Sequence, residues 1–235
     1  MPFQSIEPRR LYRQIADQIR TLIGNGEFAA GSRLPPERDL AKQLGVSRPS
    51  VREALIALEV EGLVDVRIGS GIYVQPPVEG GAPKRAPEAA AGPFELLRAR
   101  YVIESECAAL AAKSAAPEHL DAMTEALAQM RREIGEGRAQ PLDGDRLFHL
   151  RVAEATGNGA LVAVVEMLWK ERAGELYKQL EDHYDSPVLL ESALAEHEVV
   201  QKAIAAHDPD GARAAMQRHL DRAYERFSTG WDNVE

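Results

Sequence analysis

Four residues in the second half of the chain have the types and spacing of a metal site. Asp145 and His149 are four residues apart, so on one helix they would share a face and could bind the same ion. His197 and His219 lie in two further stretches of helical periodicity. Three imidazoles and one carboxylate suit zinc, with nickel and manganese as alternatives. Ordinary surface residues can show the same spacing, so the pattern alone leaves both interpretations open.

A second group of residues, near the N-terminus, has the chemistry of DNA recognition. Ser47 precedes a predicted helix and can cap it through its hydroxyl group, and apolar residues recur from Val51 to Leu58 at helical spacing. Arg48 and Arg52 are one turn apart and lie off this apolar stripe, so both are expected to point outward. Such a helix suits insertion into a DNA major groove. Taken singly, each arginine could also be an ordinary solvated surface charge.

The surrounding elements predict a winged helix-turn-helix. An amphipathic helix is expected over Leu11–Asn25, and a shorter helix over 37–44 that ends at Gly45. After the arginine-bearing helix, residues 64–67 and 72–74 alternate like two strands. The glycine-rich tip between these strands could approach a phosphate or the minor groove closely.

From Phe94 onward the sequence shows only helical periodicity, interrupted at proline and glycine. The predicted fold class is therefore mainly α, with an N-terminal winged helix-turn-helix domain and a C-terminal all-helical bundle of six or seven helices. The expected domains are a DNA-binding domain over 1–75, a linker over 76–93, a helical metal- and effector-binding domain over 94–229, and a tail over 230–235. The predicted helices of the second domain are 94–114, 117–135, 141–155, 160–182, 187–207 and 209–227.

Composition narrows the class of protein. Of 235 residues only Cys107 is a cysteine, which excludes an intramolecular disulfide and suits a reducing cytoplasm. No apolar run approaches the roughly 20 residues of a membrane span, so a cytoplasmic protein that does not enter the membrane is predicted. The net charge of -9 is unfavourable for DNA binding, but residues 1–77 hold 10 Lys and Arg against 9 Asp and Glu. Phosphate attraction must then come from clustering of basic residues on one face.

The stretch LPPERDLAKQLGVSRPSVREALIALEVEGLV resembles the DNA-binding domain of GntR-family bacterial transcription regulators. The resemblance covers roughly residues 12–74, and motif, order and spacing all agree. It implies a homodimer that binds double-stranded operator DNA. The residues that it implies in DNA contact are Arg38, Ser47, Arg48, Ser50, Arg52 and Gly69.

Three later segments, RARYVIESECAALAA, DRLFHLRVAEATGN and LAEHEVVQKAIAAHDPDGARAAMQRHL, resemble the helical effector domain, called FCD, of the FadR-type branch of this family. The resemblance implies a divalent metal held by Asp145, His149, His197 and His219, which in turn helps to hold a small carboxylate effector.

Two residues are the candidates for contact with that effector. Arg100 would grip its carboxylate through a guanidinium fork, although pairing with Glu104 is the alternative. Asn158 matches a pocket-side position, although it could simply cap a helix.

A weaker resemblance to the hexuronate-utilisation regulators makes a sugar acid the first expectation for the effector and lactate the second. The predicted function is a ligand-responsive transcription regulator, more specifically a repressor. The alternative is a metal-dependent enzyme acting on a sugar acid, but no residue is evidently placed as nucleophile or general base.

Overall fold

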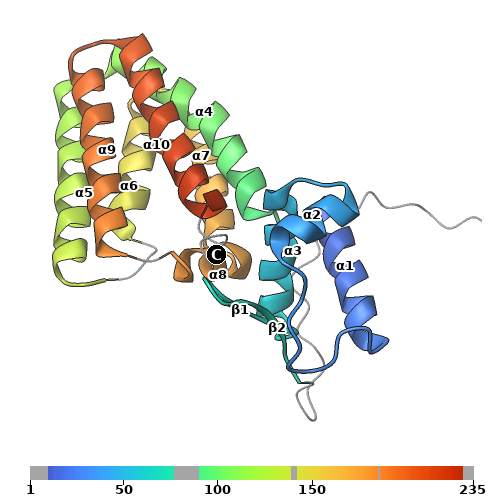
Figure 1. Ribbon diagram of the computed structural model, residues 1–235. Coiled ribbons are helices and arrows are strands. Elements are labelled where there is room, and N and C mark those ends of the chain that lie inside the picture. Colours follow the sequence, from blue (N-terminus) through green and yellow to red (C-terminus); the bar gives the residue numbers. More distant parts are fainter. Residues whose placement is uncertain (1–9, 77–89, 139–141, 185, 230–235) are drawn as a thin grey trace, which may run out of the picture. The chain divides into compact units, whose positions relative to one another are not determined.

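We describe a computed structural model of the chain, which defines residues 10–76, 90–138, 142–184 and 186–229 (Figure 1). The chain divides into two compact units, which meet in the sequence between Gly92 and Pro93. The predicted linker falls largely outside the described residues, and the predicted tail wholly so. In the part of the chain that the structure describes, no helix is both long enough and apolar enough to cross a membrane.

The first unit is a winged helix-turn-helix, as predicted. It contains α1 (Leu11–Gly24), α2 (Glu37–Leu44) and α3 (Arg48–Val60), followed by strands β1 (Val64–Arg67) and β2 (Gly71–Val74). The strands are antiparallel, with Val64 opposite Val74 and Arg67 opposite Gly71. Their alternate residues are buried, so the hairpin helps to cover a core that three short helices alone could not close.

Helix α3 is the centre of this unit. It packs against α1, α2 and β1, and its residues from Val51 to Leu58 are all buried. Gly45, at φ +68°, makes the left-handed turn between α2 and α3 that an L side chain would adopt only with strain. Figure 1 shows the three helices with the hairpin following α3.

The second unit contains seven helices within the described residues, in agreement with the predicted six or seven. Several begin at a proline, which fits the first helical turn because its missing N–H has no partner to lose there. The helices are α4 (Pro93–Ser114), α5 (Pro117–Gly135), α6 (Asp143–Glu154), α7 (Gly159–Arg172), α8 (Glu175–Asp182), α9 (Pro187–Ala205) and α10 (Pro209–Thr229).

Packing of these helices against one another builds one apolar core. Helix α10 packs along both α4 and α9, and α6 lies against α4, α5 and α7 (Figure 1). Ala108, Ala111 and Ala112 of α4 are completely buried, and their small side chains leave room for neighbouring helices to approach closely.

The prediction of one long helix over 160–182 is wrong, because the chain breaks after Arg172. The N–H of Ala173 bonds to the carbonyl of Lys170 and that of Gly174 to the carbonyl of Glu171, which closes α7 with a tight turn. Gly174 then precedes α8 with an extended backbone, at φ -70° and ψ 158°. Because of this break, α7 and α8 are two separate helices that both lie near the metal-ligand candidates.

Candidate metal centre and DNA-binding helix

The N-terminus of α3 presents polar groups to solvent. The hydroxyl of Ser47 accepts a hydrogen bond from the N–H of Ser50 at 3.3 Å, which is the predicted cap, and the two hydroxyls lie 2.8 Å apart. The side chain of Arg38 on α2 is 78% exposed, and Gly69 lies in the turn of the wing at φ +80°. These groups are free to approach a nucleic acid surface.

Glu37 of α2 holds both arginines of α3. It accepts hydrogen bonds from Arg52 at 2.7 and 3.0 Å and from Arg48 at 3.0 Å. The side chain of Arg48 is 39% exposed, whereas Arg52 is fully buried. The prediction that both arginines point outward therefore holds for Arg48 and is wrong for Arg52. The reason is that α1, α2 and β1 enclose α3 more completely than its apolar stripe indicates.

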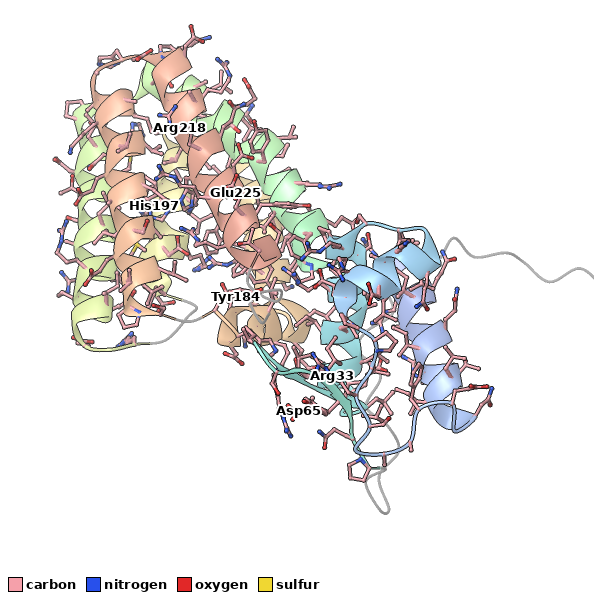
Figure 2. The ribbon with its side chains drawn as sticks, viewed as in Figure 1. Arg33, Asp65, Tyr184, His197, Arg218 and Glu225 are labelled. Atoms are coloured by element: carbon pink, nitrogen blue, oxygen red, sulfur yellow. The ribbon has the colours of Figure 1, made fainter. Side chains whose placement is uncertain are left out.

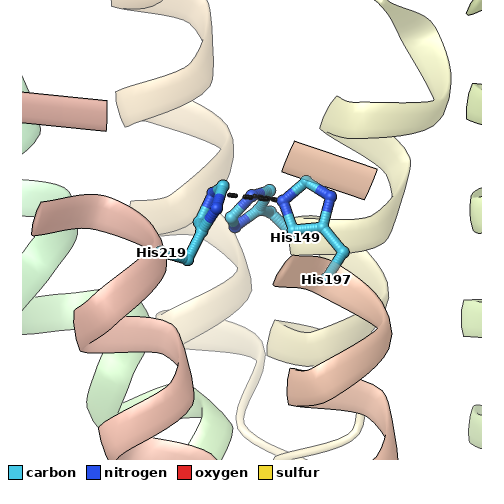
Figure 3. Close-up of side chains that lie close together, drawn as sticks. All are labelled: His149, His197 and His219. Carbon is cyan, nitrogen blue, oxygen red and sulfur yellow. Dashed lines mark hydrogen bonds between the residues drawn. The ribbon is translucent and has the colours of Figure 1, made fainter. Parts of the chain in front are cut away.

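The four predicted metal ligands come together inside the second unit. Asp145 and His149 lie on α6, His197 on α9 and His219 on α10, and all four are buried. The Nε2 atom of His197 lies 3.1 Å from the Nε2 atoms of both His149 and His219 (Figure 3). The Oδ1 atom of Asp145 lies 3.6 Å from His149 Nε2 and 3.5 Å from His197 Nε2. Figure 2 marks His197 within this bundle of helices.

A metal ion would satisfy these donor atoms better than hydrogen bonds between the rings can. Glu104 Oε2 lies 2.5 Å from His149 Nδ1, and Glu196 Oε2 lies 2.8 Å from His219 Nδ1. If both rings carry their hydrogens on Nδ1, on the side of these carboxylates, their Nε2 lone pairs face His197. A neutral imidazole carries one N–H and cannot donate to both. The Nε2 atom of His149 also lies 3.4 Å from Arg100 Nη2. A cation would accept all the lone pairs.

The spacing of the donors supports the same assignment. Zinc–nitrogen bonds of about 2.0–2.1 Å in tetrahedral geometry place neighbouring ligand atoms about 3.3 Å apart. Four of the six separations between the donor atoms, at 3.1, 3.1, 3.5 and 3.6 Å, lie around this value. The donor atoms of the three histidines all lie within 4.8 Å of one another.

Protonation also favours metal binding. Burial, reinforced by His219 and His149, holds the pKa of His197 well below its ordinary value, and burial likewise lowers the pKa of His219. Burial alone would raise the pKa of Asp145, but the charge of Arg172 together with His149 and His197 outweighs it and holds that pKa well below its usual range. At neutral pH the two rings are therefore neutral and Asp145 is ionised, which are the forms that ligate metals.

A cavity of about 60 Å³ opens beside this cluster. Asp145 and His219 form part of its wall, which also includes three arginines, Arg100, Arg172 and Arg226. Such a volume holds a few water molecules, each needing roughly 10–15 Å³. A larger ligand would require side chains of the wall to move.

Arg100 and Asn158, the two candidates for contact with the effector, differ in their positions relative to the cavity. Arg100 lines the cavity, yet its guanidinium donates to Glu104 at 2.8 and 3.3 Å, so the pairing considered as the alternative is also present. Asn158 is not among the residues that line the described cavity. Its side-chain oxygen accepts from the N–H groups of Ala160 and Leu161, so the capping alternative is present, and contact of Asn158 with the effector stays a prediction.

Arg172, Glu181 and Trp169 were not identified from the sequence. Arg172 donates to Asp145 Oδ2 at 2.7 Å and to Glu181 Oε1 at 2.6 and 3.1 Å. The guanidinium carbons of Arg100 and Arg172 each lie 4.4 Å from the Trp169 ring centroid, so this buried indole positions both cations. Only the break between α7 and α8 brings Arg172 and Glu181 together, and the periodicity of the sequence did not indicate it.

Both units match known protein families. Residues 11–74 match the family of bacterial regulatory proteins named gntR, and residues 95–222 match the FCD domain. The Exu regulon transcriptional regulator of Escherichia coli K12 is 41% identical over 219 residues, which is 92% of this chain and 83% of that protein. The Uxu operon transcriptional regulator of the same strain is 39% identical over 225 residues, 93% of this chain and 87% of that protein.

A solved structure of Lar from Listeria monocytogenes covers 94% of this chain and 98% of its own, with a TM-score of 0.52 and 18% identity. At this level of identity the likeness concerns the fold alone.

Proposed function

Since this chain belongs to the gntR family of bacterial regulatory proteins and carries an FCD domain, we propose that it is a metal-dependent sensor of a sugar acid. The family consists of transcription regulators, and the relatives above are regulators and not enzymes, so the alternative of a metal-dependent enzyme is set aside. The effector would bind in the helical domain and control the binding of operator DNA by the N-terminal domain.

One observation supports the proposal that the helical domain senses a ligand. The donor atoms of Asp145, His149, His197 and His219 converge beside a cavity whose wall contains three arginines. A bound divalent ion, with zinc as our first choice and nickel or manganese as alternatives, would supply a positive charge for an anionic ligand to approach. Arg100 and Arg172 add guanidinium groups that suit a carboxylate.

The effector class rests on the relatives. Their names, Exu regulon and Uxu operon regulators, motivate a hexuronate, a six-carbon sugar acid, as the ligand of this chain. Lactate is the second candidate. The ligand would shift the population between DNA-binding and non-binding arrangements by no more than its difference in affinity for them.

On the DNA side, we propose that Arg38, Ser47, Arg48, Ser50 and Gly69 contact the operator. Arg38 and Ser47 are exposed and the other three residues are half-buried, so none of the five is enclosed in the core, which supports this assignment. We propose that Arg52 positions Glu37 and Arg48 from within the domain. The chain would act in the cytoplasm as a homodimer on a pseudo-palindromic operator, and as a repressor that its ligand releases.

A thermal-shift and gel-shift series tests the proposal. Full-length protein is incubated with D-glucuronate, D-galacturonate, L-lactate or acetate, each with zinc and after chelation. We expect a uronate to raise the melting temperature only in the presence of metal and to release operator DNA selected in vitro with the ligand-free protein. A melting temperature that no acid changes, with or without metal, would refute the sensing role.

A further inference from the structure

One carboxylate oxygen of Glu181, at the wall of the cavity, has no hydrogen-bond donor among the residues that the structure describes. Glu181 lies near the end of α8 and is 3% exposed, and it is among the residues that line the cavity. Arg172 donates twice to its Oε1 atom, at 2.6 and 3.1 Å. Its Oε2 atom is buried and accepts no hydrogen bond within the described residues. A buried carboxylate oxygen without a donor is costly, so a ligand that brings a donor gains from meeting it.

The position of Glu181 relative to the metal ligands limits which part of a ligand could reach it. Arg172 bridges the two acids, donating to Asp145 Oδ2 at 2.7 Å on one side and to Glu181 Oε1 on the other. Glu181 is thus separated from Asp145 by the width of a guanidinium group. A ligand whose carboxylate lies at the metal cluster must extend past Arg172 to reach Glu181.

The groups around the cavity indicate the kind of donor. Arg100, Arg172 and Arg226 line it together with the acids Asp145 and Glu181, so these charges largely offset one another and the wall does not require a charged ligand group. Tyr177, Tyr184 and Ser186 add hydroxyl groups to the wall, and Figure 2 marks Tyr184 just beyond the end of α8. A neutral donor in polar surroundings, such as a hydroxyl group, meets both conditions.

We propose that Glu181 accepts a hydrogen bond from a ligand hydroxyl remote from the ligand carboxylate, so that the cavity selects polyhydroxy acids over plain and α-hydroxy acids. The inference rests on the proposed sensing of a carboxylate. It goes further by naming the residue that recognises the hydroxyl groups of the ligand. The α-hydroxyl group of lactate is adjacent to its carboxylate and would remain at the metal end, out of reach of Glu181.

The first test uses unaltered, zinc-loaded protein and two acids of similar shape. D-glucuronate in its ring form carries hydroxyl groups, whereas cyclohexanecarboxylate has the same six-membered ring size and carboxylate without them. Calorimetric titration should give at least tenfold tighter binding of glucuronate, because a site built around a polar group rejects an analogue that lacks its partner. Equal or tighter binding of cyclohexanecarboxylate would overturn the inference while leaving carboxylate sensing intact. Binding of neither acid, and of neither D-galacturonate nor L-lactate, would overturn the proposed function itself.

A matched pair of variants assigns the effect to Glu181. In Glu181→Met the affinity for glucuronate should fall roughly ten- to a hundredfold, the range for hydrogen bonds to charged groups, while that for cyclohexanecarboxylate is retained. Glu175→Met, an exposed change on the same helix, should alter neither affinity. If Glu181→Met weakens both acids equally, Glu181 acts only by holding Arg172, and the inference is refuted.

Discussion

Replacing Arg52 by alanine distinguishes a structural arginine from one that reads DNA. Family resemblance places Arg52 in DNA contact, whereas the structure buries it against Glu37 with hydrogen bonds of 2.7 and 3.0 Å. Removing one partner of a buried ion pair typically costs about 3–5 kcal/mol. Arg48 still donates to Glu37 at 3.0 Å, so the lower end of that range is expected for Arg52→Ala.

Arg48→Ala provides the contrast. The side chain of Arg48 is 39% exposed, so its ion pair with Glu37 contributes no more than about 1 kcal/mol to stability. If Arg48 reads a base, its loss should weaken specific operator binding by about 1–3 kcal/mol. The two substitutions should therefore affect different measurements, stability for Arg52 and operator affinity for Arg48.

Urea unfolding and hydrogen exchange of the full chain measure the first effect, and gel-shift titration measures the second. Arg52→Ala should lower the protection of α2 and α3 against exchange, whereas Arg48→Ala should not. A double variant, Glu37→Leu with Arg52→Met, should recover most of the lost stability, because apolar groups often replace a buried pair at little cost. If Arg52→Ala instead keeps full protection and loses specific operator binding, the buried pair is not structural and Arg52 contacts DNA directly.

Three further predictions concern the helical domain. His197→Ala should reduce bound metal, measured by elemental analysis, and the response to ligand, while ligand-free protein still binds operator DNA; unchanged metal content would exclude His197 as a ligand. Glu104→Gln should weaken metal binding about 10–100-fold in competition with a chelator, because Glu104 lies 2.5 Å from His149 Nδ1 and outer contacts of this kind orient the ligand ring. In chelated protein, burial with its neighbouring imidazoles lowers the pKa of His197 below the ordinary 6.5, so the unfolded chain binds more protons and the unfolding free energy should fall as pH drops below that value. Urea unfolding at about pH 5.5 and 7.5 measures this, and equal stability at both would contradict it.

The architecture of both units was predictable because their local patterns agree with the packing. Ser47 caps α3 as expected, Gly45 ends α2, and the four metal-ligand candidates of α6, α9 and α10 converge. The cap and the glycine stop follow from local backbone chemistry, whereas the metal-ligand set needed the family resemblance because its spacing alone left two interpretations open.

The predictions were wrong where contacts between distant parts of the chain determine the local structure. Arg52 lies off the apolar stripe of α3, but neighbouring elements surround the helix, and a buried acid on α2 receives the arginine. Gly174 would cost only about 1 kcal/mol inside a helix, so its presence did not indicate a break. Arg172 and Glu181 were missed for the same reason, since their pairing exists only once the chain has turned.

The joint between α7 and α8 determines more than the path of the chain. In one continuous helix, nine residues span about 13 Å and end on the opposite side, so Arg172 and Glu181 could not meet. A two-residue turn brings the ends of the two helices together instead. Insertions, deletions or stiffening at this joint would therefore redistribute charge around the cavity without replacing any residue that lines it. Ligand preference in this domain can diverge through connector length as well as through pocket chemistry.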